Sequence, residues 1–257
     1  MLYTISILTS VVFATTYPLC FWISADDPLK NKFHRFHLGL PNFVGGVAMV
    51  FVLISNVPMN IKVAVVLWKA VYFGVTQFYW RKETPNPFVI TFTCLLGLVA
   101  FCMLHGHYIS SKPLAIAISI LSGLIFSAAL YAMNLGHWYL NVHGLPLSHL
   151  MRANTVFWVL VGLRLVYDLL AMLTNKILYQ GDMIALYQFM GRTDGFLLFI
   201  PIFFGVLFPF FSLYFVRETI KLKNTQSATG ILYVILCAIV LADMAYKYYL
   251  IKFSIVL

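Results

Sequence analysis

The sequence predicts an all-α fold: a polytopic transmembrane helical bundle of about eight helices, with both termini on the outer side, forming one domain over residues 1–257. Hydrophobic residues make up 62% of the chain and charged residues only 10%. Soluble domains carry about 25% charged residues and would aggregate with so apolar a surface. Apolar stretches recur along the whole sequence, and only short loops separate them. These observations predict a multi-pass membrane protein without a soluble domain.

Eight apolar segments reach the roughly 20 residues that a helix needs to cross the hydrocarbon core. Loops marked by proline, glycine, asparagine or charge separate them. The segments are approximately residues 2–23, 39–56, 62–80, 87–108, 113–137, 153–174, 193–216 and 228–250.

The first, third, seventh and last segments differ from a simple apolar crossing. Residues 2–23 lack a basic start and a convincing cleavage site, so we expect a membrane helix rather than a removed signal peptide. The third segment contains Lys69, which makes its ends hard to place. Residues 184–216 are too long for one crossing, so their first part is expected to be interfacial or broken. Thr225 or Ser227 is expected to cap the last helix.

Basic residues are distributed unequally between alternate loops, with nine on one side of the predicted bundle and four on the other. The nine are Lys30, Lys32, Arg35, Arg81, Lys82, Arg152, Arg217, Lys221 and Lys223, and the four are Lys62, Lys112, Lys176 and Lys252. Basic loops are retained in the cytoplasm, so the side with nine is expected to be cytoplasmic. The same bias accounts for the net charge of +9. We therefore expect a lipid bilayer partner, the cell inner membrane, and no nucleic acid.

Seven charged residues lie inside or at the edge of the predicted helices. They are Lys69, Arg164, Asp168, Arg192, Asp194, Asp243 and Lys247. A charge at the centre of a membrane helix costs roughly 2.5–3.5 kcal/mol on insertion scales. Each of these residues is therefore expected to face a partner charge, a ligand or a water-filled cavity.

The predicted topology places these charges toward the outer leaflet. The i,i+4 spacing puts Arg164 and Asp168 on one face of the sixth helix, and Asp243 and Lys247 on one face of the eighth. We expect one ligand-binding pocket or proton path there. Its candidate residues are Lys69, His105, His107, Arg164, Asp168, Arg192, Asp194, Asp243 and Lys247. In the alternative, the i,i+4 pairs are ion pairs that only lock helices together.

Seven histidines raise the question of a haem. A b-type haem in a helical bundle usually takes two histidines from facing helices, and His37 and His137 are the candidate pair. Most histidines here fall at predicted helix ends, where imidazole can cap carbonyl groups, so haem b is disfavoured. The cysteines show no metal-ligand spacing, and no metal site is expected. Lys247 lies too close to its helix end for a retinal Schiff base.

The C-terminal third resembles a known family. Its seventh helix opens with Arg192 and Asp194, a proline follows within the helix, and a basic loop leads to the final string Ala242-Asp243-Met244-Ala245-Tyr246-Lys247-Tyr248-Tyr249. This order resembles the polysulfide/dimethyl sulfoxide reductase membrane-anchor family, although Asp and Lys replace its more familiar Glu and Arg. The resemblance implies a haem-free, eight-helix bundle that exchanges electrons between a membrane quinone and an iron–sulfur partner subunit, with the quinone near the outer face.

A quinone site needs a flat apolar slot with a proton donor or acceptor at each carbonyl. Arg164 or Lys69 is expected to polarise a quinone oxygen, and Asp243 or Asp168 to pass protons outward. His105 or His107 would connect the pocket to water.

The first interpretation is therefore a membrane subunit of a bacterial respiratory or redox complex that anchors partner subunits and binds quinone. No catalytic residue of its own is assigned. A small transporter or channel using the same charges, gated by prolines of the seventh helix, is one alternative. A structural subunit of a larger membrane complex is another. The absence of visible inverted repeats weighs against the transporter.

Overall fold

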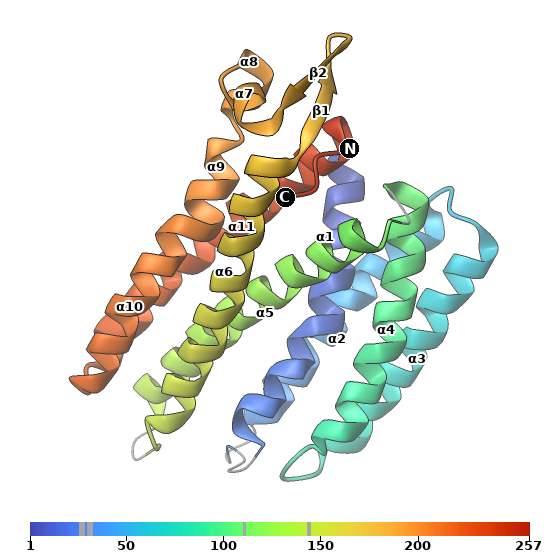
Figure 1. The fold of residues 1–257 in the computed structure, drawn as a ribbon. Helices are drawn as coiled ribbons and strands as arrows, with labels where there is room; N and C mark the ends of the chain where they lie inside the picture. Colours follow the sequence, from blue (N-terminus) through green and yellow to red (C-terminus); the bar gives the residue numbers. More distant parts are fainter. Residues whose placement is uncertain (26–28, 30–32, 110–111, 143–144) are drawn as a thin grey trace. The chain divides into compact units, whose positions relative to one another are not determined.

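The computed structural model describes residues 1–25, 29, 33–109, 112–142 and 145–257. Within these residues, eight helices are long and apolar enough to cross a membrane (Figure 1). They span Leu2–Ser24, Phe33–Ile54, Met59–Trp80, Pro87–Tyr108, Pro113–Asn141, Ser148–Thr174, Thr193–Lys221 and Thr225–Phe253. The predicted all-α membrane bundle of about eight helices is confirmed. Which side of the membrane holds the termini stays a prediction, and Lys30 and Lys32 lie outside the described residues.

The first crossing joins an α-helix to a 3-10 helix, and six of the others are single α-helices. The first comprises α1 (Leu2–Thr16) and η1 (Tyr17–Ser24). The six are α2 (Phe33–Ile54), α3 (Met59–Trp80), α4 (Pro87–Tyr108), α5 (Pro113–Asn141), α6 (Ser148–Thr174) and α11 (Thr225–Phe253). Several extend beyond the apolar segments seen in the sequence: α2 begins at Phe33 rather than residue 39, because His34 and Arg35 do not interrupt a helix. Hydropathy marks only the part of a helix that lies in hydrocarbon.

The seventh crossing is broken near its start, as predicted. Short helices α7 (Leu186–Met190), α8 (Thr193–Phe196) and α9 (Phe199–Ile202) lead to the π-helical segment η2 (Phe203–Leu207) and then to α10 (Phe208–Lys221). Pro209 gives a physical reason for the π segment, because proline donates no amide hydrogen bond and crowds the preceding turn.

A short β-hairpin precedes these helices and was not predicted. Strand β1 (Lys176–Tyr179) pairs antiparallel with β2 (Asp182–Ala185), and Tyr179 lies opposite Asp182. Gln180 and Gly181 form the turn, and both have positive φ, 52° and 95°. Two positive φ angles match the type I′ turn of tight hairpins, which Asn-Gly signals more clearly than Gln-Gly.

The cap of α11 also differs from the prediction. Asn224, rather than Thr225 or Ser227, is the cap residue, and its side-chain oxygen accepts a hydrogen bond from the Ser227 backbone N–H at 3.0 Å. Asparagine is among the strongest N-cap residues for this reason.

The chain divides into two compact units, Met1–Ser127 and Ala128–Leu257. The first contains α1 to α4 and the start of α5. The second contains the end of α5, the hairpin and α6 to α11. The prediction of a single domain is not tested by this division.

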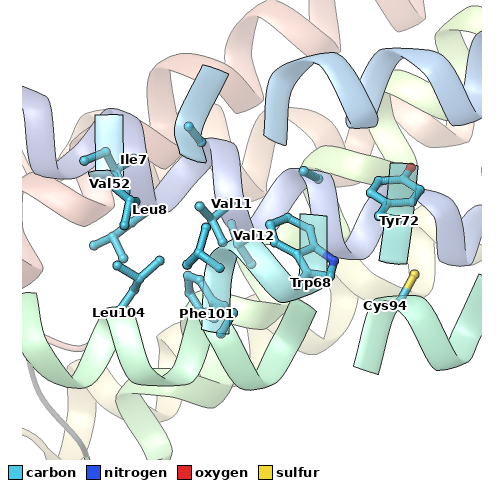
Figure 2. Packing of buried hydrophobic residues seen from close by; sticks show 14 of the residues in the cluster. Ile7, Leu8, Val11, Val12, Val52, Trp68, Tyr72, Cys94, Phe101 and Leu104 are labelled. Carbon is cyan, nitrogen blue, oxygen red and sulfur yellow. The ribbon is translucent and has the colours of Figure 1, made fainter. Parts of the chain in front are cut away.

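In the first unit, α1 packs against α2 and α4, and α3 packs against α2 and α4 (Figure 1). Residues on every side of α1 are buried, including the consecutive run 11–16. A helix that is apolar all round is stable only when it is enclosed, which explains its place in the core. Figure 2 shows Val11 and Val12 of α1 near Phe101 of α4 and Trp68 of α3.

Gly97 allows α4 to approach α1 closely. A Cβ atom at Gly97 would lie 2.2 Å from Thr15 Cγ2 and 2.6 Å from Trp68 Nε1. Both neighbours are buried, so neither can move away freely. A small residue at this position therefore sets the separation of these helices, as glycine does in many membrane bundles.

We predict that Gly97→Ala lowers stability by about 1–3 kcal/mol, the usual cost of overpacking a core. Equilibrium unfolding of the purified protein in mixed detergent micelles measures this loss. Gly74→Ala is the matched control, because a Cβ atom there meets no atom within 4 Å. Equal stability of the two variants would contradict the packing account.

Candidate functional site

Four buried charges of the second unit lie on α6 and α11. Arg164 and Asp168 belong to α6, whereas Asp243 and Lys247 belong to α11, and none is more than 5% exposed. Arg164 Nε donates a hydrogen bond to Asp168 Oδ1 at 2.8 Å. Lys247 Nζ donates one to Asp243 Oδ1. Each i,i+4 pair is therefore neutralised within its own helix.

Tyr246 connects the two helices. Its hydroxyl donates to Asp168 Oδ2 at 2.5 Å, and the Arg164 guanidinium lies 4.0 Å from its ring centroid. Its ring also packs on η2, where a Cβ atom at Gly205 would lie 3.0 Å from Tyr246 Cε2. The sequence pattern predicts no role for Tyr246, although its place between Asp243 and Lys247 puts it near the same face.

Charges of opposite sign also lie at matching positions along α6 and α11. Arg164 and Asp243 each lie ten residues before the end of their helix (174 − 164 and 253 − 243), and Asp168 and Lys247 each lie six before it. The Tyr246–Asp168 bond is consistent with this register. The result is two cations and two anions with no net charge. This arrangement favours the helix-locking alternative over a charged ligand pocket at this place.

Arg192 and Asp194 lie at α8 and do not belong to this network. Both are exposed. Tyr179 of the hairpin donates its hydroxyl to Asp194 Oδ2 at 3.0 Å, and Tyr249 of α11 donates to the Asp194 carbonyl at 2.8 Å. The hydrogen bond to Asp194 raises the pKa of Tyr179 above its ordinary value. Asp194 therefore fastens the hairpin to α11.

In the first unit, Lys69 lies in the middle of α3 and is 5% exposed. Its Nζ donates to the Asn42 carbonyl at 2.7 Å and to Asn42 Oδ1 at 2.5 Å. It also lies 5.0 Å from the Tyr72 ring and 5.6 Å from the Trp68 ring. Glu83 is the only acid among the described residues of this unit and follows the end of α3. Lys69 thus has no carboxylate partner among the described residues.

Lys69 forms part of the wall of a groove of about 700 Å³ between α2 and α3. Such a volume is typical of small-molecule sites. The aromatic walls are Phe43, Phe73 and Trp80, and Gly46 leaves the space beside them open, because a Cβ atom there meets nothing within 4 Å. The sequence singled out Lys69 but not the groove, which depends on the pairing of α2 with α3.

His105 and His107 lie on α4 and do not line this groove. His105 is buried, and its Nε2 is 3.0 Å from Ser119 Oγ of α5. His107 is exposed near the end of α4. Through this described contact, His105 connects α4 to α5.

The two haem candidates have different surroundings. His37 is buried, with Nδ1 2.7 Å from the Tyr17 hydroxyl and its ring 3.9 Å from the Phe33 ring. His137 is exposed, and its Nδ1 lies 3.5 Å from the Tyr233 hydroxyl. They belong to different units, so their pairing stays a prediction. In the described part of the chain, no three His, Cys, Asp or Glu residues are grouped to hold a metal ion.

Comparisons with protein-family models, curated proteins and solved structures find no match to this chain. The resemblance of the C-terminal third to the reductase membrane anchors stays a prediction.

We predict that the Arg164–Asp168 pair behaves non-additively. Arg164→Met leaves a buried carboxylate without its cation and is expected to cost about 3 kcal/mol of stability. Adding Asp168→Leu removes that carboxylate, so the double variant should be more stable than Arg164→Met alone. Unfolding in mixed micelles gives the coupling energy.

The exposed pair Lys221–Glu218 is the control for this cycle, with nitrogen and oxygen 2.7 Å apart. Its coupling energy in Lys221→Met and Glu218→Leu variants should stay below about 1 kcal/mol. Additive losses at Arg164 and Asp168 would show that the two charges do not depend on each other.

Proposed function

We propose that the chain is an integral membrane subunit of a bacterial respiratory or redox complex and that it binds a quinone in the groove between α2 and α3. The observation that carries this proposal is Lys69: a buried amine, satisfied only by Asn42 oxygens among the described residues, on the wall of an apolar groove. Intramembrane ionisable residues that lack a counter-charge commonly mark a ligand or an ion path.

The groove has the composition that a quinone requires. Phe43, Phe73 and Trp80 offer flat apolar surfaces to a ring. Two of the three N–H groups of a protonated Lys69 bond to Asn42, and the third would donate to a quinone oxygen and polarise it. Gln77 lies two turns further along the same face of α3, and its amide would serve the second oxygen.

Electrons for such a quinone would come from a partner subunit. The proposed residues bind and orient the ring, and a proton-accepting quinone oxygen would lie beside Lys69. The groove runs from Lys69 at mid-helix toward Trp80, at the end of α3 that the predicted orientation places on the cytoplasmic side. The proposed quinone site therefore differs in depth from the outer-leaflet pocket expected from the sequence.

One observation favours the transporter alternative. Broken helices near buried charges are typical of transporter sites, and here the π segment η2 packs on Tyr246 beside Asp168. The neutral pairing of all four charges weighs against it, because a path for ions needs charges that are free to exchange partners. We therefore retain quinone binding as the main proposal.

We predict that Gly46→Leu lowers quinone affinity at least about tenfold, because the new side chain fills the groove. Stability should not fall, since a Cβ atom at Gly46 meets no atom within 4 Å. Titration of the purified protein with a soluble short-chain quinone measures the affinity. Gly74→Leu is the matched control: it is equally free of contacts but lies outside the groove.

Lys69→Met should weaken the same binding about tenfold or more, as expected for loss of a hydrogen bond from a charged donor. Its control is Lys62→Met, because Lys62 is a partly exposed lysine of α3 that bonds to the Leu53 carbonyl and lies outside the groove. Wild-type affinity in both Gly46→Leu and Lys69→Met would exclude this groove as the quinone site.

A further inference from the structure

The end of the groove opposite Lys69 carries a guanidinium group with an unsatisfied donor. Arg35 lies in the first turn of α2, and its Nε is buried without a hydrogen-bond partner among the described residues. The guanidinium carbon lies 6.0 Å from the ring centroid of Trp80 on α3. A buried donor left unpaired costs about 1–3 kcal/mol. An acceptor from outside the chain would remove this cost.

The groove leads to this guanidinium. Trp80 lines the groove, and so does Gly39, one helical turn after Arg35. A Cβ atom at Gly39 would lie only 3.6 Å from Trp80 Cζ3, so this glycine and the indole lie in contact distance. Arg35 therefore stands at the rim where the apolar groove ends.

The length and opening of the groove fit one lipid leaflet. Its lining on α3 runs from Val66 to Trp80, which is about 21 Å at 1.5 Å per residue. One leaflet including its headgroup region is about 20–22 Å thick. Phe43 and Phe73 of the lining are 73% and 57% exposed, so the groove opens sideways to the acyl chains.

Among the described residues, most charged side chains at this rim are basic. Arg81 and Lys82 follow Trp80 directly, and Glu83 is the only acid of this unit within the described residues. Asp26, Asp27, Lys30 and Lys32 lie outside those residues. Basic clusters at the membrane surface attract anionic lipids by about 1 kcal/mol per residue. Arginine adds a planar fork of donors that matches phosphate oxygens.

We propose that this rim is a binding site for an anionic phospholipid. The lipid phosphate accepts hydrogen bonds from Arg35, and one acyl chain lies in the groove between α2 and α3. Trp80 packs between the headgroup and the chain, as tryptophan does at membrane interfaces. This site does not rest on quinone binding, because its phosphate ligand is at the rim and the proposed quinone ligand is at Lys69. An acyl chain in the groove would compete with a quinone for the same space.

The test is native mass spectrometry of the purified full chain, released from detergent with equal amounts of dioleoylphosphatidylglycerol and dioleoylphosphatidylcholine. The wild type should retain the anionic lipid about fivefold more than the zwitterionic one, the effect expected for about 1 kcal/mol. Arg35→Gln should bring the two lipids close to parity. Arg35→Lys, which keeps the charge and guards against misfolding of the first variant, should retain most of the preference.

Arg217→Gln is the matched control, since Arg217 is an exposed arginine of α10 in the other unit. It should leave the lipid preference unchanged. Equal retention of both lipids by the wild type, or an equal effect of Arg217→Gln and Arg35→Gln, would overturn the proposal. Displacement of the lipid by an equal concentration of inorganic phosphate would also overturn it, because the groove would then add nothing to binding. Loss of quinone binding with the lipid preference intact would refute only the proposed function.

Discussion

The structure depends on one constraint: a charge surrounded by hydrocarbon must find its partners inside the protein or in a ligand. The two units meet this constraint differently. In the second unit, Arg164, Asp168, Asp243 and Lys247 neutralise one another, and the Tyr246 hydroxyl joins their helices. In the first unit, the described hydrogen-bond partners of Lys69 are the two oxygens of Asn42, and a groove lies beside it.

This difference separates structural charge from candidate functional charge. A charge network with no net charge contributes to helix pairing. Removing one of its charges lowers the stability of the protein, so a loss of activity in such a variant does not by itself reveal a function. Among the described residues, the Lys69 amine is satisfied by neutral oxygens on an open apolar groove, so a ligand can bind there without first breaking a described ion pair. Arg35 is the corresponding case at the rim: its buried Nε has no described hydrogen-bond partner, and a lipid phosphate is proposed to bind it. The α2–α3 pair therefore carries both proposals.

The eight crossings followed from composition and segment length, because hydrocarbon thickness dictates both. Helix ends did not, since His34 and Arg35 extend α2 beyond the apolar stretch without leaving the helix. The spacing of Arg164 and Asp168 correctly placed them on one face. The predicted depth of the charged residues in the membrane did not show which of them pair with each other. The groove was not foreseeable, because it arises where α2 pairs with α3 and leaves open space beside Gly46, rather than from any local pattern.

Both proposals place an apolar ligand between α2 and α3. Photo-crosslinking with an azido-quinone in native membranes, followed by peptide mapping, tests this placement most directly. A quinone bound there should label residues 39–50 and 66–80, and excess unlabelled quinone should remove this label. If label removed by unlabelled quinone instead lay on α6 or α11 around Asp168 and Asp243, the quinone would bind at the charge network of the second unit and not between α2 and α3.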